Sequence, residues 1–186
     1  VGNRQFHLAQ EVLMYLSDIH THSIASGHGT NCTISDMAKE AGRKGLKLLG
    51  ISDHGPGTLA SGTSSYFRGL PFCPRKRFGV EVLYGVELNI LDIQGHIDLS
   101  DELLSNLDYA IISMHGQNYR SGTVKENTLA YQNAMKYPAV KVLGHCDNPA
   151  FPGSGHAAPS RFPRHACDAR GWSPPCRLAG GGRRCQ

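Results

Sequence analysis

Seven side chains of metal-binding type recur along the chain, each close to the end of an apolar segment. They are six histidines and one glutamate: His20, His22, His28, His54, Glu87, His115 and His145. Neutral imidazole is a ligand for zinc, manganese and iron, and a carboxylate can bridge two such ions. Because these residues follow successive apolar segments, we expect one site that holds several divalent metal ions.

The first two histidines are separated by a single residue. Side chains alternate between the two faces of a strand, so His20 and His22 point the same way and can chelate one ion. One such pair alone is equally consistent with two polar residues at a strand end; the later candidates favour the metal. Asp18 and Asp53 each precede a candidate ligand, and we interpret them either as groups that orient an imidazole or as polar caps of strand ends.

The elements that must position these residues alternate between strand and helix patterns. Strands are predicted at residues 15–19, 47–52, 81–90, 109–113 and 140–143, and helices at residues 34–41, 102–107 and 125–136. Thr33 and Asp36 form a capping-box pattern at the first helix, and Gly45 can end it. Strands separated by helices predict a parallel sheet with right-handed crossovers.

Two connecting segments are predicted to lack long elements. Residues 91–99 fit a small hairpin, and residues 61–79, rich in Gly, Ser, Pro and aromatic residues, fit a long loop. The basic residues Arg68, Arg75, Lys76 and Arg77 of that loop could lie near a substrate. The alternative, a basic loop in solvent, is the interpretation we favour.

Composition limits the class of protein. The chain has 186 residues, of which 40% are apolar and 18% charged, as in a globular domain. The sequence has no run of about 18 apolar residues, so no membrane span is predicted. It also shows no signal peptide pattern, in which basic residues precede an apolar segment. The cysteines form no Cys-x-x-Cys pair, which favours a reduced, cytoplasmic setting.

The two ends of the chain differ from its centre. Residues 1–151 carry 13 Lys and Arg against 14 Asp and Glu, whereas residues 152–186 carry six Arg and one acid. We therefore expect three segments: a non-native leader or upstream read-through at residues 1–13, a catalytic-type domain at residues 14–151, and an Arg-, Pro- and Gly-rich tail at residues 152–186 that is out of frame and disordered.

Five motifs in order resemble those of the polymerase-and-histidinol-phosphatase (PHP) family, above all its stand-alone bacterial phosphatases of the YcdX type. The motifs are Asp-Ile-His-Thr-His, Ser-Asp-His-Gly, Gly-Val-Glu-Leu-Asn, Ser-Met-His-Gly and Gly-His-Cys-Asp-Asn-Pro. The resemblance implies an α/β fold, a distorted (βα)7 barrel of the TIM-like kind, of which about the first five strands are present. It also implies a trinuclear metal centre at the carboxyl ends of the strands.

The resemblance further assigns ligands to ions. His20 and His22 would hold one ion, Glu87 would bridge it to a second held by His115 and His145, and His28 and His54 would hold the third. The implied activity is hydrolysis of a small phosphorylated substrate by metal-activated water, with zinc, manganese or iron. No Gly-x-Ser-x-Gly nucleophile motif is present.

One family feature has no counterpart. The last ligands of the family come from an Asp-x-His motif, and none occurs after residue 151. We therefore expect impaired activity, the alternative being a non-catalytic metal-binding fragment or an accessory PHP domain. Asp147 is interpreted as a turn residue. We expect no membrane partner and no nucleic acid partner, because the Arg-rich tail has few interleaved aromatics, and we leave a homo-oligomer open.

Overall fold

The computed structural model describes residues 16–153, so the expectations about the leader (1–13) and about residues 154–186 of the tail lie outside the described residues. The strands are β1 (Ser17–Thr21), β2 (Leu48–Ile51), β3 (Lys76–Arg77), β4 (Val80–Asn89), β5 (Tyr109–Ser113) and β6 (Val140–Leu143). The helices are α1 (Ile34–Arg43), α2 (Ser64–Gly69), α3 (Asp101–Leu104) and α4 (Val124–Ala134), with 3₁₀ turns η1 (Ile24–Ser26) and η2 (Leu70–Phe72).

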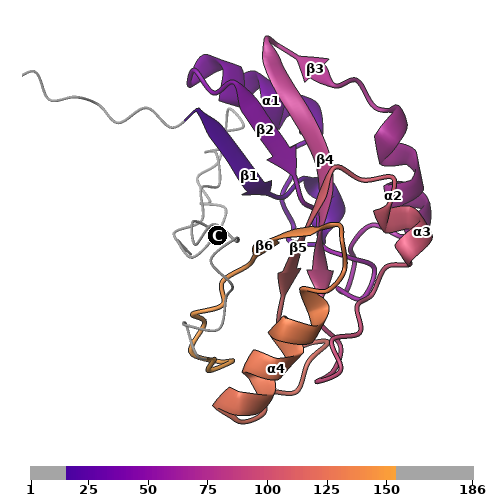
Figure 1. Cartoon of the computed structure of the whole chain (residues 1–186). Helices are drawn as coiled ribbons and strands as arrows, with labels where there is room; N and C mark the ends of the chain where they lie inside the picture. Colours follow the sequence, from indigo (N-terminus) through magenta and orange to yellow (C-terminus); the bar gives the residue numbers. More distant parts are fainter. Residues whose placement is uncertain (1–15, 154–186) are drawn as a thin grey trace, which may run out of the picture.

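Five strands form a parallel sheet in the order β1-β2-β4-β5-β6, and β3 pairs antiparallel with the start of β4. The long strand β4 pairs with β2 through its first half and with β5 through its second half. The sheet curls into a half-barrel, with helices packed against it (Figure 1). The predicted α/β class and the five parallel strands of a partial barrel are confirmed.

The sheet has two apolar faces. On β4, Val82, Val86 and Leu88 join the main core, to which α1 and α4 also contribute. The opposite, inner face carries a smaller cluster: Ile19, Leu83, Tyr109, Ile111 and Val142. This alternation follows from the two-residue period of a strand. Glu87 lies an even number of residues from Leu83, so its side chain also points toward the inside of the curl.

Tyr109 links distant strands across the inner face. Its hydroxyl donates to the carbonyl oxygen of Ile19 on β1, at 2.7 Å. The ring crosses Gly50 on β2 and Gly85 on β4, and a Cβ at Gly85 would lie 2.6 Å from it. These two glycines leave the space that lets one side chain span the curled sheet.

The local predictions were confirmed at some elements and wrong at others. Thr33 and Asp36 make both hydrogen bonds of the capping box. The predicted loop at residues 61–79 instead contains α2, η2 and β3, because Phe67 and Leu70 are buried in the core (0% and 2% exposed). The predicted hairpin at residues 91–99 is a turn closed by a single bridge between Ile90 and Ile97.

Strand β1 runs two residues further than predicted, so that His20 lies within it. Within residues 16–153, no helix has the length and apolar character needed to cross a membrane.

Candidate metal centre

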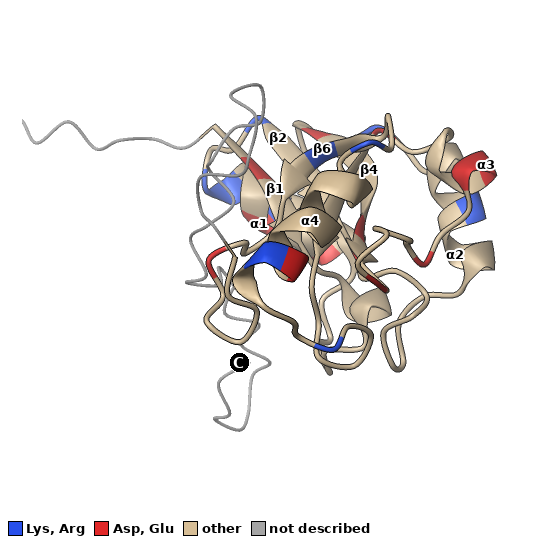
Figure 2. Cartoon of the chain, turned by 60° about the horizontal axis from the view of Figure 1, so that its bottom comes forward, with Lys and Arg blue, Asp and Glu red and all other residues tan. Residues whose placement is uncertain are grey.

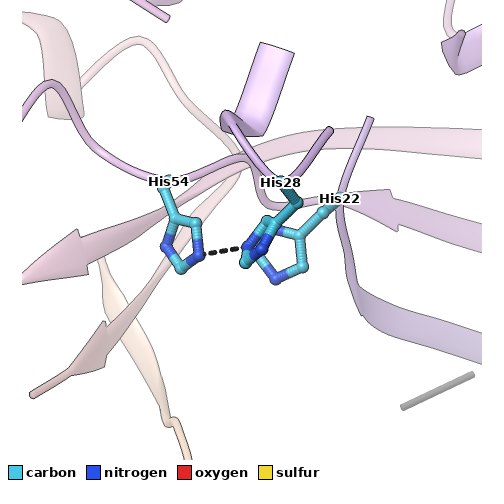
Figure 3. A group of neighbouring side chains, drawn as sticks. All are labelled: His22, His28 and His54. Atoms are coloured by element: carbon cyan, nitrogen blue, oxygen red, sulfur yellow. Dashed lines mark hydrogen bonds between the residues drawn. The ribbon is translucent and has the colours of Figure 1, made fainter. Parts of the chain in front are cut away.

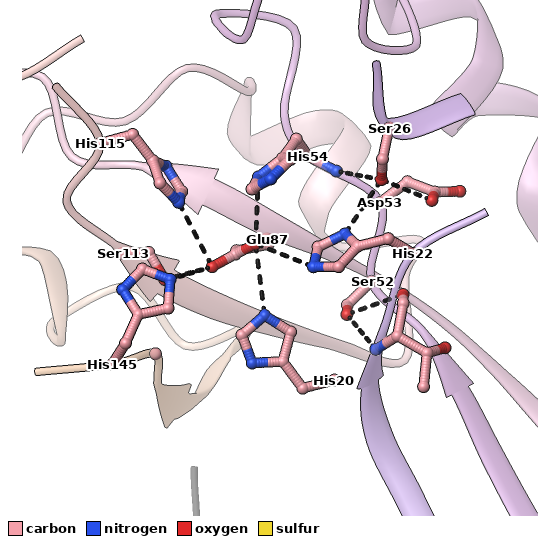
Figure 4. A network of polar contacts seen from close by, with 12 residues as sticks. His20, His22, Ser26, Ser52, Asp53, His54, Glu87, Ser113, His115 and His145 are labelled. Carbon is pink, nitrogen blue, oxygen red and sulfur yellow. Dashed lines mark hydrogen bonds and ion pairs between the residues drawn. The ribbon is translucent and has the colours of Figure 1, made fainter. Parts of the chain in front are cut away.

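All seven candidate ligands meet in one cavity at the carboxyl ends of the parallel strands. Figure 3 labels His28, and Figure 4 labels the other members around the carboxylate of Glu87. The cavity has a volume of about 550 Å³. Its walls are formed by His20, His22, His28, His54, Glu87, His115, His145, Asp147, Asn148 and Pro149. The curl of the sheet thus brings into one cavity the residues that the sequence predicted to share one site.

Glu87 lies at the centre of this cluster and is fully buried (0% exposed). One carboxylate oxygen, Oε2, faces His54 Nδ1 at 3.0 Å, and both His20 Nε2 and His22 Nε2 at 3.3 Å. The other oxygen, Oε1, faces His145 Nε2 at 2.9 Å and His115 Nε2 at 3.5 Å. Five imidazoles therefore converge on one carboxylate.

The histidines fall on two sides of Glu87. The β1–β2 side consists of His20, His22, His28 and His54, and the β5–β6 side consists of His115 and His145. On the β1–β2 side the Nε2 atoms of His28 and His54 are only 2.6 Å apart (Figure 3). This is hydrogen-bond distance, so one of the two rings donates to the other.

Three sets of ligand atoms are each compact enough to hold one ion, with all atoms within 4.8 Å of one another. The sets are His22, His28 and His54; His20, Glu87 and His145; and His54, Glu87 and His115. The structure thus groups His22 with His28 and His54 rather than with His20. The assignment of ligands to individual ions made from the family resemblance stays a prediction.

Burial and neighbouring charge set the protonation of the cluster. Burial, helped by the nearby imidazoles, lowers the pKa of His22 to about 3, and burial with His54 also lowers the pKa of His28. Burial would raise the pKa of Glu87, but the surrounding histidines outweigh it and hold that pKa well below its usual range. Neutral imidazoles around an ionised carboxylate are the forms that bind a metal ion.

His20 differs from its neighbours. Burial lowers its pKa, yet the contacts with Glu87 and the charge of Asp18 prevail, and the net pKa is raised. Asp18 itself accepts from the backbone N–H of His20, at 3.2 Å, rather than from an imidazole. Asp18 therefore holds the backbone at His20, and its negative charge helps to raise the pKa of the His20 imidazole.

Asp53 is buried beneath the β1–β2 side and accepts four hydrogen bonds. The donors are the backbone N–H of Ser23 (2.5 Å), the hydroxyl of Ser23 (2.7 Å), the hydroxyl of Ser26 (2.7 Å) and the hydroxyl of Tyr66. Burial and Asp53 raise the pKa of Tyr66, so its hydroxyl keeps its proton and donates. These donors are hydroxyl groups and one backbone N–H rather than imidazoles, so Asp53 organises the turn that carries His22 and His28.

On the β5–β6 side, close backbone approach positions His145. This residue has a left-handed φ of 29°, which is uncommon for a residue with a Cβ. A Cβ at the preceding Gly144 would collide with the hydroxyl of Ser113 and lie 3.3 Å from Glu87 Oε1. Ser113 in turn donates to Glu87 Oε1 at 2.5 Å. Only glycine at position 144 lets β6 approach the carboxylate this closely.

Several residues at the site were not singled out from the sequence: Ser26, Asn89, Asp98 and Ser113. Asn89 Oδ1 contacts His115 Nδ1 at 2.6 Å, and Asn89 is in turn bound to Asp98. Strand alternation offers a signal for Asn89 and Ser113, since each lies two residues from a residue that faces the cavity. For Ser26 and Asp98 the sequence carries no comparable signal.

The basic residues of the 61–79 segment lie away from this cavity. Arg75 pairs with Asp108, and its guanidinium lies 5.5 Å from the ring centre of Tyr84. Arg77 donates to the hydroxyl of Ser35 at 2.7 Å. Both belong to the region of β3, which pairs with the start of β4, whereas Glu87 lies near its end. Contacts with Asp108 and Ser35 thus hold Arg75 and Arg77 near the start of β4 rather than at the cavity. Figure 2 shows Lys and Arg spread over several elements of the fold.

The donor set fits divalent metal ions. Glu87 Oε2 is buried without a hydrogen-bond donor aligned to it, although three imidazole nitrogens lie within 3.3 Å. Nitrogen and oxygen ligands of one such ion lie about 2.1 Å from the metal and hence roughly 3–4 Å from one another. The spacing around Glu87 matches that requirement, and imidazole with carboxylate suits zinc, manganese or iron.

A family model for the PHP domain matches residues 18–168 of this chain. The chain belongs to the PHP domain family. Among curated relatives, a "Probable phosphatase" of Caldanaerobacter subterraneus is 46% identical over 141 residues, which cover 75% of this chain and 55% of the relative. Proteins of the same printed name from Clostridium botulinum and Clostridium novyi are 44% and 41% identical over 140 residues. The chain spans little more than half the length of these relatives (57% in both clostridial proteins).

Proposed function

We propose that this PHP domain is a phosphoesterase that binds divalent metal ions through His20, His22, His28, His54, Glu87, His115 and His145 and hydrolyses a small phosphate monoester. The observation that carries the proposal is the convergence of five imidazoles on the buried carboxylate of Glu87. The names of the relatives and the family of the chain support the reaction class.

Phosphate monoesters are anionic and react slowly with water, so a catalyst must neutralise charge and provide a nucleophile. When bound, zinc, manganese or iron would supply both, since such ions activate water near neutral pH and bind phosphate oxygens. The part of the chain is to hold the imidazoles and one ionised carboxylate in a fixed arrangement. The lowered pKa values of His22, His28 and Glu87 favour the forms of these three groups that bind a metal ion.

The cavity also shapes substrate access. His20, His22, His115 and His145 each keep between 21% and 23% of their side chain exposed, whereas Glu87 keeps 1%. The imidazoles therefore present an open face to a phosphate group while the carboxylate is screened from water. A volume of about 550 Å³ is suited to a small phosphorylated molecule.

Metal content and hydrolysis on the full 186-residue chain test the proposal. We expect bound Zn²⁺ or Mn²⁺ by elemental analysis. We also expect metal-dependent hydrolysis of 4-nitrophenyl phosphate that is slow, because the Asp-x-His motif of the family is absent, and that a chelator abolishes. His54→Ala should reduce both, because His54 belongs to two of the three compact ligand sets. His96→Ala is the matched control, since His96 is a largely exposed histidine (67%) outside the cavity.

The outcomes separate the alternatives. Bound metal without hydrolysis in the full chain would contradict the phosphoesterase and support a non-catalytic metal-binding domain. Absence of bound metal would contradict both, as would equal losses in the His54 and His96 variants.

A further inference from the structure

We propose that Ser26 and Asn89 are positioning residues that fix which ring nitrogen of His22 and of His115 carries the proton, so that Nε2 of each faces Glu87 with a free lone pair. The inference rests on the proposed metal-binding function of the same histidines. Neither residue lines the cavity, and both act through the imidazoles that they contact.

The hydroxyl of Ser26 has one proton and two acceptor sites, and the structure uses all three. Its proton goes to Asp53 Oδ1 at 2.7 Å, because an ionised carboxylate can only accept. The backbone N–H of His54 donates to the same hydroxyl at 3.2 Å. The remaining contact, His22 Nδ1 at 2.9 Å, must therefore be a donor.

A proton on Nδ1 leaves Nε2 of His22 without one. That nitrogen is the atom that lies 3.3 Å from Glu87 Oε2. Ser26 is fully buried, as is Asp53, so no solvent molecule competes for the hydroxyl (0% exposed for both). The two residues come from η1 and from the end of β2, and they join these segments beneath the ring of His22.

Asn89 plays the same part on the other side through an amide. Its Nδ2 donates to Asp98 Oδ2 at 2.5 Å, and its backbone N–H donates to Asp98 Oδ1 at 2.9 Å. The reversed amide would set its carbonyl oxygen against that carboxylate, which is repulsive. Asn89 Oδ1 therefore faces His115 Nδ1, at 2.6 Å, and can only accept from it.

Both arrangements share one design: a carboxylate, a neutral linking group and an imidazole Nδ1. Asp53 and Ser26 serve His22, and Asp98 and Asn89 serve His115. His145 provides the internal contrast, because its buried Nδ1 has no hydrogen-bond partner among the described residues. Hydrogen bonds of this kind hold metal-binding histidines in one tautomer and one ring orientation.

Long-range ¹H–¹⁵N NMR of the metal-free full chain at neutral pH reads the tautomers directly. We expect His22 and His115 to carry their proton on Nδ1 in the unchanged protein. A proton on Nε2 of either ring would overturn the assignment for that histidine, and this measurement needs no variant to fold.

Ser26→Ala tests the causal step. We expect His22 to lose its single tautomer while His115 keeps its own, and we expect Zn²⁺ affinity, measured by competition with a chromophoric chelator, to fall by about 10-fold or more. Asn89→Leu should do the reverse, changing His115 and leaving His22 unchanged. If the Ser26 variant does not fold, the Asn89 variant alone tests whether such a residue fixes the tautomer of its histidine.

Ser52→Ala is the matched control. Ser52 is also fully buried and binds backbone atoms of Thr21, at 3.0 and 3.2 Å, without contacting a histidine in the described part of the chain. A merely structural role for Ser26 predicts that both serine variants lower stability and leave the His22 tautomer intact. Failure of the phosphoesterase proposal would leave the tautomers untouched, so the two proposals fail separately.

Discussion

The two sides of Glu87 bring their histidines to the same carboxylate by different means. On the β1–β2 side, a buried network around Asp53 fixes the turn after β1 through four hydrogen bonds. On the β5–β6 side, His145 relies on a left-handed backbone and on the absence of a side chain at Gly144. Polar side chains also hold His115, through Asn89 and Asp98, so close approach of backbone is the particular means by which His145 is placed.

This difference has consequences for tolerance to change. A carboxylate with four donors that loses one keeps three hydrogen bonds, so the expected loss is about that of a single hydrogen bond. A close backbone contact is less tolerant, since any added atom must displace a neighbouring group in a closely packed interior. We therefore expect the β5–β6 side to be the more sensitive to single substitutions away from the ligands.

Glu87→Gln should have the largest effect, because it removes the one group common to both sides. Loss of groups that merely orient ligands costs about 10- to 100-fold in affinity. We expect loss of the central charge to lower Zn²⁺ affinity and hydrolysis of 4-nitrophenyl phosphate by at least about 100-fold. Glu81→Gln, an exposed glutamate at the start of the same strand, is the control and should behave as the unchanged chain. Retention of two or more bound ions in the Glu87 variant would contradict the central role of this residue.

Gly144→Ala should come next and should act on the β5–β6 side. The added methyl group meets Ser113 and approaches Glu87, so we expect a loss of about 1–3 kcal/mol in the free energy of unfolding, measured by urea denaturation. Bound metal should fall as well. Gly116→Ala supplies the matched control, because a Cβ there meets nothing within 4 Å, although the residue directly follows His115. Equal losses of stability and of bound metal in the Gly144 and Gly116 variants would contradict the claim that close packing at Gly144 positions His145.

Tyr66→Phe should have the smallest effect, because Asp53 keeps its three other donors. We expect the free energy of unfolding to fall by about 1–2 kcal/mol and metal affinity to change less than in the Gly144 variant. Tyr84→Phe removes a comparable hydroxyl contact, to the carbonyl oxygen of Pro74 at 2.8 Å, at a distance from the site. A larger loss of bound metal in the Tyr66 variant than in the Gly144 variant would reverse the proposed contrast between the two sides.

Much of the fold was accessible from local patterns. The apolar segments that became β2, β4, β5 and β6 were predicted to within one residue at each end, because buried parallel strands give continuous apolar runs. The capping box at Thr33 marked the start of α1 correctly. A second capping box, Thr123 with Glu126, begins α4 and carries the same sequence signal.

The elements that were missed depend on tertiary burial. Nothing local in residues 61–79 favours a helix strongly, and Thr63 makes no side-chain cap; α2 forms because Phe67 is buried in the core. In the same way, Asp98 became part of the site only because the turn after β4 brings it to Asn89. A contact between a turn and a strand leaves no periodic trace in the sequence.

The sequence by itself determined the types of the candidate ligands, their order at successive strands and hence the family, because strand alternation and motif spacing are local properties. The tertiary structure decided how the ligands are grouped around Glu87 and which tautomers Ser26 and Asn89 can impose. It also decided that Asp53 acts through hydroxyl groups rather than on an imidazole. These features depend on distances between segments far apart in the chain, and the curl of the sheet around β4 sets those distances.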